Sequence, residues 1–305
     1  MFVHGSARGL VIGLILAAGA VAPAWAQVTA SIAAPLSASL RYDWRESVGE
    51  RYQYRLRWYP SLALNEALSL HTLIASGDAF SSSYNTIDDD GADPIKLRRA
   101  FVRYQYRQGK LEAGVIPPYK GRVSSTGLSK DGWLTGLRAV HQFSSKDQFE
   151  IVAGELSQPD NPGALEKLDN PNYWEAEYSS AVRHGVSFEL AAEHMLGDDF
   201  VRGEVRKQLT PQWLASVESI NKLGDTTKWV LSAGRTYGAT KVFVYYSFVP
   251  QGFGQRAELT EDFVNYGHSW VLETDTKINQ QLAWFTKFEH VKNNWRVQLG
   301  VSFSL

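Results

Sequence analysis

The sequence ends with Trp295-Arg-Val-Gln-Leu-Gly-Val-Ser-Phe-Ser-Leu305, a stretch in which apolar and polar side chains alternate. Alternation with a period of two is typical of a β-strand whose two faces meet different environments. The apolar face continues as far as Leu305, although terminal residues usually fray into water. A strand that closes a membrane barrel has lipid against its outer face and the first strand along its edge. This stretch therefore favours a β-barrel in a membrane.

The first residues have the pattern of an export signal. Arg8 precedes the apolar run 9–22, and Ala24-Trp25-Ala26 offers the small residues of a cleavage site. We expect residues 1–26 to be a secretory signal peptide, removed near Ala26 after export through the Sec pathway. No other stretch approaches the ~18 apolar residues of a membrane helix. The remaining chain is then a short periplasmic segment, 27–35, and one barrel, 36–305.

The composition excludes several kinds of site. Cysteine is absent, which argues against a disulfide scaffold, thiolate metal ligands and thiol catalysis. Lys and Arg number 31 and Asp and Glu 32, so no bulk positive charge favours nucleic acid. A mean hydropathy of −0.26 is too polar for a helical membrane protein, but it suits strands that bury every second residue in lipid.

Alternating segments bounded by turn residues recur along the chain, and none has a convincing helical period. They predict an all-β fold, a transmembrane antiparallel up-and-down barrel of about sixteen strands (roughly 14–18) with both termini periplasmic. The expected strands are 36–45, 51–59, 66–75, 96–107, 110–116, 132–143, 147–156, 172–181, 185–195, 199–208, 212–220, 228–236, 240–249, 264–273, 280–289 and 294–305.

The connections between these strands support the same fold. Outer-membrane barrels alternate short periplasmic turns with longer external loops. Here the long connections, 76–95, 117–131, 156–171 and 250–263, all fall at odd positions, and the even connections are short. A periplasmic sandwich or soluble barrel is the alternative, but its outer face would be polar. The more apolar face here carries large aromatic residues near strand ends: Trp44, Trp58, Trp133, Trp174, Trp213, Trp229, Trp284 and Trp295.

The polar face of the strands predicts a lumen whose charges are separated by sign. Arginines dominate strands one, two and four, and glutamates dominate strands seven to nine, nearly half a turn away. We expect a basic wall to face an acidic wall across water, and charged linings of this kind tune which solutes pass. A polar lining with no selective role is the alternative. The basic candidates are Arg41, Arg45, Arg51, Arg55, Arg57, Arg99, Arg103 and Arg107. The acidic candidates are Glu150, Glu175, Glu177, Glu189 and Glu193.

Three features together resemble the Gram-negative outer-membrane porins: the sixteen strands, the hydrophobic last strand, and the connection Pro117-Pro-Tyr-Lys-Gly-Arg-Val-Ser-Ser-Thr-Gly-Leu-Ser-Lys-Asp131. Two stretches, Leu97-Arg-Arg-Ala-Phe-Val-Arg-Tyr104 and Leu111-Glu-Ala-Gly-Val-Ile-Pro117, are similar in sequence to strands of anion-preferring porins. The resemblance covers the whole mature chain in architecture but only these motifs in sequence. It implies that the connection 117–131 folds into the lumen and narrows it. The candidate constriction residues are Lys120, Arg122, Lys130 and Asp131.

The chain departs from that family in three respects. The connection 117–131 is short and mostly basic, whereas the family usually brings acidic residues there. The chain has few residues per strand, and its last residue is Leu305 where the family commonly has Phe. A partial constriction, or none, is compatible with these differences. The resemblance also implies contacts with lipopolysaccharide, assembly of a homotrimer, and recognition of the last strand by the barrel-assembly machinery.

No catalytic or metal site emerges from the residues. His268 and Ser269 are neighbours on one strand and would point to opposite faces, so they cannot share a hydrolytic site. The acidic run around Asp88, Asp90 and Asp93 invites a calcium interpretation, but it lacks the bidentate Glu of such loops and more simply forms a solvated turn. We therefore expect that the protein has no cofactor and no enzymatic activity.

The sequence leaves more than one function open. We expect a passive channel for small hydrophilic solutes, with anions favoured by the arginines. One alternative is the barrel of an export machine, such as an outlet for an anionic polysaccharide with periplasmic partners. A structural sleeve around a partner protein is the other. The sequence does not identify the solute.

Overall fold

The computed structural model describes residues 30–77, 79–87, 95–118, 122–156, 164, 168–259, 266–292 and 294–305. The predicted signal peptide, 1–26, and the candidates Asp88, Asp90, Asp93 and Lys120 lie outside these residues. Within them, no helix has both the length and the apolar character to span a membrane.

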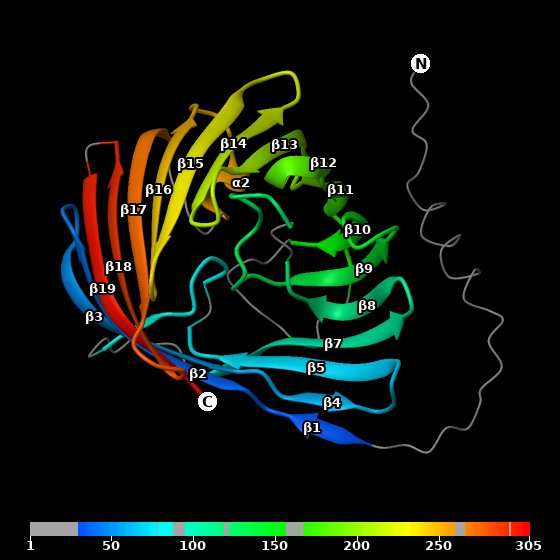
Figure 1. Ribbon diagram of the computed structural model, residues 1–305. Coiled ribbons are helices and arrows are strands. Elements are labelled where there is room, and N and C mark those ends of the chain that lie inside the picture. The colour runs from blue at the N-terminus through cyan, green and yellow to red at the C-terminus, as the bar shows by residue number, and fades with distance from the viewer. Residues whose placement is uncertain are drawn as a thin grey trace.

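In the described part of the chain, nineteen strands form one antiparallel sheet that closes on itself, and three of them are short: β1 (Ser31–Ala33), β4 (Ser61–Ala63) and β6 (Asn85–Thr86). The other sixteen follow one another around the barrel in chain order (Figure 1). They are β2 (Leu36–Arg45), β3 (Gly49–Trp58), β5 (Leu68–Ala75), β7 (Lys96–Tyr106), β8 (Gly109–Ile116), β9 (Leu134–Gln142), β10 (Asp147–Glu155), β11 (Tyr173–Ala181), β12 (Val186–Met195), β13 (Asp198–Gln208), β14 (Trp213–Lys222), β15 (Thr227–Tyr237), β16 (Thr240–Val249), β17 (Gly267–Lys277), β18 (Leu282–Val291) and β19 (Asn294–Ser304).

The last strand closes the barrel against β2. Their register places Val297 opposite Trp44 and Phe303 opposite Ala38. The ladder continues to the final residue, because the Leu305 N–H donates to the Leu36 carbonyl at 2.8 Å and the Leu36 N–H donates back at 3.1 Å. The closed sixteen-stranded barrel predicted from the sequence is thus confirmed, and no strand edge remains at the seam.

The structure differs from the sequence prediction in two notable segments. The strand expected at 264–273 is β17, Gly267–Lys277, because the hairpin turn lies at 278–281 rather than at 275–279. There the Asn279 side-chain oxygen accepts the N–H groups of Gln281 and Leu282, both at 2.8 Å. The segment 27–35, expected outside the barrel, contains β1, which pairs with β4.

The two faces of the wall differ as the alternation predicts. On β12, Leu190 is 56% exposed on the outer face, whereas its neighbour Glu189 is 1% exposed on the inner face. Tryptophans are exposed on the outside of seven strands: Trp58, Trp174, Trp213, Trp229, Trp270, Trp284 and Trp295. Trp133 is an exception to the sequence prediction. It precedes β9 and is buried, with its ring 5.1 Å from that of Phe80.

Long and short connections lie at opposite rims, as predicted. One rim carries the long segments 76–95, 117–133, 156–172 and 250–266, and the last of these includes α2 (Gln255–Glu258). The other rim carries the short turns and the 3-10 turn η2 (Arg183–Gly185). One connection at the long rim is only two residues, Leu196-Gly197, both with positive φ (53° and 97°), as a tight two-residue hairpin turn requires.

The segments that follow β5 and β8 fold inside the ring of strands (Figure 1). Phe80, Leu128, Phe253 and Leu259 come from long connections, and they pack against inward side chains near the strand ends, such as Phe200. This cluster forms a hydrophobic core at the long-loop rim. It holds the inward segments against the wall, because burying such side chains is favourable by about 1.5–3 kcal/mol each.

Candidate functional site

The interior of the barrel is the candidate site, and its basic side is organised around Asp43 of β2. The buried Asp43 carboxylate pairs with Arg51 at 2.6 Å, Arg296 at 2.7 Å and Arg45 at 3.5 Å. The three guanidinium side chains are 27%, 20% and 33% exposed, whereas the carboxylate is fully covered. One negative charge therefore holds three positive charges that still face the water of the lumen.

Arg41 and Arg55 extend this basic surface. Their guanidinium carbons lie 3.6 Å and 4.3 Å from the ring centre of Tyr84, which belongs to the inward segment after β5. The ring thus holds two cations side by side by cation–π attraction. Arg41 also donates to Gln53 at 2.8 Å, which helps to fix its position.

Arg57 and Arg99 bind the far end of the inward segment 117–133. Arg57 pairs with Asp131 at 2.5 Å, and Arg55 lies 3.6 Å from the same carboxylate. Arg99 donates to the backbone carbonyls of Gly132, at 2.9 Å, and Lys130. Both arginines are buried, so their role on this side is to hold the segment.

A chain of alternating charges continues along β7 to β10. Glu112 pairs with Arg103 at 2.7 Å, Lys110 at 2.9 Å and Arg138 at 2.8 Å, and Arg138 pairs in turn with Glu150 at 2.9 Å. Here too one buried carboxylate, Glu112, holds several cations, of which Arg103 and Lys110 remain partly exposed.

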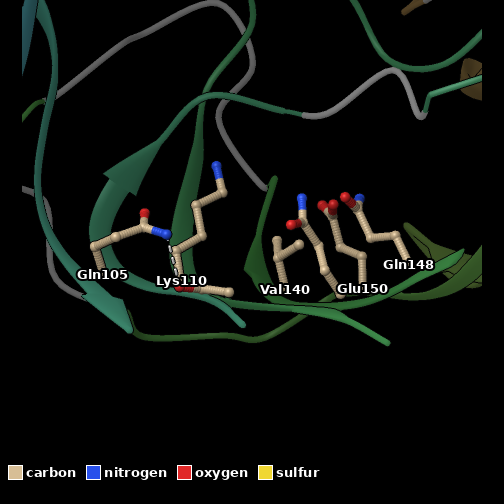
Figure 2. Close-up of a pocket in the computed structure, with 7 residues that line it drawn as sticks. Gln105, Lys110, Val140, Gln148 and Glu150 are labelled. Atoms are coloured by element: carbon tan, nitrogen blue, oxygen red, sulfur yellow. Dashed lines mark hydrogen bonds between the residues drawn. The ribbon is translucent and has the colours of Figure 1, made fainter. Parts of the chain in front are cut away.

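Two cavities lie on this side of the interior. One of about 190 Å³ is lined by residues of β7 to β10, and Figure 2 shows the polar ends of Lys110, Gln148 and Glu150 projecting to the same side of the wall. The other, of about 280 Å³, has Arg99 and Arg103 among its lining residues. Space for a polar solute is thus found beside basic side chains.

The acidic side has the opposite arrangement, because its glutamates surround Arg202 of β13. The buried guanidinium pairs with Glu175 at 2.7 Å, Glu177 at 3.1 Å, Glu193 at 2.8 Å and also with Glu189. These groups are 1–5% exposed. The expected acidic wall facing open water is therefore not what the structure contains, because the carboxylates are covered.

Residues 123–126 of the inward segment bind Glu189 of this cluster and two further inward glutamates, Glu204 and Glu218. The Val123 N–H donates to Glu189 at 2.8 Å, the Ser124 hydroxyl to Glu218 at 2.6 Å, and the Thr126 hydroxyl to Glu218 at 2.7 Å. Ser125 donates through both its N–H and its hydroxyl to Glu204. Four consecutive residues thus bind three carboxylates, in the charge-assisted hydrogen bonds that are stronger than neutral ones.

The same segment extends far into the barrel. The Arg122 side chain donates to the carbonyl of Lys146 at 3.1 Å, and Lys146 lies in the short turn between β9 and β10 at the opposite rim. Ser129 donates its N–H to the Leu259 carbonyl at 3.0 Å, near the long-loop rim. The segment 122–133 therefore spans much of the height of the interior.

Arg256 of α2 makes a further contact between the strands and the inward segment. Its guanidinium donates to Glu193 at 2.8 Å and to the Thr126 carbonyl at 3.0 Å, so it joins the wall to the inward segment. Burial alone would lower the pKa of Arg256, but the charge and the hydrogen bond of Glu193 together outweigh burial, and the pKa is raised above its ordinary value. Arg256 therefore stays charged at any physiological pH.

Comparison with solved structures identifies the architecture. A variant of the Rhodobacter blastica porin superposes with a TM-score of 0.65 at 11% identity, over 90% of this chain and 100% of that chain. A loop-deletion variant of OmpT, an outer-membrane protein of Vibrio cholerae, gives a TM-score of 0.57 at 9% identity, over 90% and 99%. The chain has the porin fold. Neither a family model nor a curated protein matches its sequence.

The porin fold explains which site predictions could be made from alternation. Most of the predicted arginines and all five glutamates lie on inward positions of the strands, but Arg107 lies exposed in the turn after β7 rather than on the inner face. The alternation of β13 and β14 also places Arg202, Glu204 and Glu218 on the inner face, but they are not among the lumen residues predicted from the sequence. Arg256 carried no periodic signal, because it lies in a connection.

The two residues considered for catalysis, His268 and Ser269, lie on opposite faces of β17. Ser269 is buried on the inner side, whereas His268 is exposed and bonds to the Tyr246 hydroxyl at 2.7 Å. The described part of the chain contains no cluster of three His, Asp or Glu residues that could hold a metal ion.

Proposed function

We propose that this protein is a passive outer-membrane channel for small hydrophilic solutes, with a preference for anions. Its fold is that of outer-membrane porins, its outer face is apolar with exposed tryptophans, and its interior is lined by charged side chains. In this proposal the short turns and both termini are periplasmic, and the long connections are external.

The observation that carries the anion preference is the unequal exposure of the two signs of charge. Arg45, Arg51, Arg103 and Arg296 are 20–33% exposed, whereas the carboxylates they pair with, Asp43 and Glu112, are fully covered. The glutamates of the other side are covered by residues 123–126 and by Arg202. Beside the Asp43 and Glu112 clusters, the charge that a solute meets is therefore mainly positive, which favours anions.

The inward segments favour small solutes. Residues 122–133 span much of the interior, and Phe253, Arg256 and Leu259 pack against the same wall. A barrel narrowed in this way suits single small molecules better than an extended polysaccharide or an enclosed partner protein. The export and sleeve alternatives therefore gain no specific support.

Ion selectivity tests the proposal. Purified protein in planar bilayers should show conductance steps. Under a salt gradient, the reversal potential should have the sign that an anion-selective channel gives. The triple variant Arg41→Gln, Arg55→Gln, Arg103→Gln removes three partly exposed charges while Asp131 keeps Arg57 and Glu112 keeps Arg138. We expect its anion selectivity to fall by severalfold.

The matched control is Arg235→Gln, which removes one positive charge from the outer face of β15. Its reversal potential should equal that of the unaltered protein. A complete absence of conductance steps would exclude an open pore, and an unchanged reversal potential in the triple variant would show that these arginines do not line the path.

A further inference from the structure

An arginine lies on the apolar outer face near the short-turn rim. Arg235 alternates on β15 with Trp229, Leu231 and Tyr237, and its register partner on β14 is Trp213. Its guanidinium carbon lies 4.8 Å from the Trp213 ring centre and 4.0 Å from that of Tyr237. Both rings are partly exposed, at the level where aromatic residues meet lipid headgroups.

The guanidinium has no anionic partner in the described part of the protein. It takes part in no ion pair there, and its Nε is shielded by the neighbouring atoms and makes no hydrogen bond. The arginines of the interior differ, because Arg51 and Arg202 each pair with carboxylates. A charge on the lipid-facing side costs up to about 2–4 kcal/mol at the bilayer midplane and little near the interface, so Arg235 needs the headgroup region.

A second cation shares this surface. Lys207 of β13 faces outward two strands away, and its ammonium group donates to the carbonyl of His184 in η2. The register Lys207–Ala215 and Ala215–Ala233 places small side chains between the two cations. Lys207 is level with Ala233, two residues from Arg235 along β15, and two strand spacings are about 10 Å, so the backbone positions of the two cations are roughly 12 Å apart.

We propose that Arg235, flanked by Trp213 and Tyr237, binds the phosphate of an anionic glycerophospholipid in the leaflet at the short-turn rim, with Lys207 as the second positive charge. A planar guanidinium presents paired N–H donors to a phosphate while its faces stack on aromatic rings. An anionic lipid suits the site better than a zwitterionic one, because the two charged side chains that form it, Lys207 and Arg235, are both cationic. The proposal assumes membrane insertion, as the proposed function does, but it is independent of conduction.

Lipid binding can be measured by native mass spectrometry of the detergent-solubilised barrel, titrated with phosphatidylglycerol or phosphatidylcholine. We expect tighter binding of phosphatidylglycerol, and a loss of about tenfold in Arg235→Gln, as when a charge-assisted hydrogen bond is lost. Arg235→Lys keeps the charge without the planar stack and should be intermediate. Arg107→Gln is the matched control, because Arg107 is an exposed arginine at the same rim.

Several outcomes would overturn the site. One is equal binding of the two lipids, and another is equal binding by Arg235→Gln and Arg107→Gln. Competition by millimolar inorganic phosphate would show a site for free phosphate instead of a lipid. If Arg235→Gln does not fold, Arg235→Lys is the deciding variant. A ratio of phosphatidylglycerol to phosphatidylcholine binding that equals that of the unaltered protein would then contradict the site. Failure of the proposed channel would appear separately, as absent conductance with lipid binding intact.

Discussion

The Asp43 cluster and the Arg202 cluster are inverse arrangements of the same groups on opposite sides of one barrel. Asp43 is a covered carboxylate surrounded by Arg45, Arg51 and Arg296, which remain partly exposed. Arg202 is a covered guanidinium surrounded by glutamates that are themselves covered. The two clusters differ in whether another segment covers them. Residues 123–126 bind glutamates on the acidic side and none of the residues of the Asp43 cluster.

This comparison separates two uses of charge. Where the surplus charge faces water, it acts on passing solutes and contributes little to stability, since exposed ion pairs are worth about 0.2–1 kcal/mol. Where the surplus charge is buried, as in the glutamates around Arg202, each carboxylate depends on its partners, because an unpaired buried charge is strongly unfavourable. The basic side therefore sets selectivity, and the acidic side fixes the inward segment.

The largest expected effect is that of removing Arg202. Arg202→Met leaves Glu175, Glu177 and Glu189 buried without their cation, and we expect a loss of about 3–5 kcal/mol of stability. Thermal unfolding followed by the heat-dependent mobility shift on gels measures this loss. Adding Glu175→Gln and Glu189→Gln should restore part of it. An Arg202→Met barrel as stable as the unaltered one would break the comparison.

The next effect concerns the segment that covers the glutamates. The triple variant Ser124→Ala, Ser125→Ala, Thr126→Val removes the hydroxyl donors that bind Glu204 and Glu218. We expect the segment to detach, so that single-channel conductance and current noise increase and selectivity shifts toward cations. Ser144→Ala, in an exposed short turn, is the control. Unchanged conductance and selectivity would mean that the segment does not shield this side.

The smallest effect on stability is expected at the Asp43 cluster. Arg51→Gln leaves Asp43 paired with Arg296 and Arg45, so we expect a loss of under about 1 kcal/mol. Anion selectivity should nevertheless fall measurably in the bilayer assay. A loss of stability as large as that of Arg202→Met would show that the two clusters have the same structural role.

The sequence was enough to predict most of the barrel because alternation and connection length are local properties. The stretch 295–305 indicated a strand with one apolar face, and the structure pairs it with β2. The errors occurred where local signals compete. Around 275–279, polar residues that continue the inner face of β17 were interpreted as a turn, and Trp133 was assigned to the outer face although it precedes its strand.

The candidate site was less predictable, because alternation gives the face of a side chain but not what covers it. Glu189 was assigned to the inner face from its position, yet its burial depends on Val123, 66 residues away. Arg256 completes the same cluster by binding the carbonyl of Thr126, 130 residues away. No periodicity links such residues, so these contacts arise only when the segments fold into the interior.

The sequence by itself determined that the chain is a closed barrel with an apolar outside and a charged inside, because a period of two places side chains on fixed faces. Only the tertiary structure decided which of the inner charges meet water. That outcome depends on the path of residues 122–133 and of α2 through the interior, where they bury the glutamates and leave Arg45, Arg51 and Arg296 partly exposed. Exposure is a property of the assembled barrel, since it requires contacts between segments far apart in the chain.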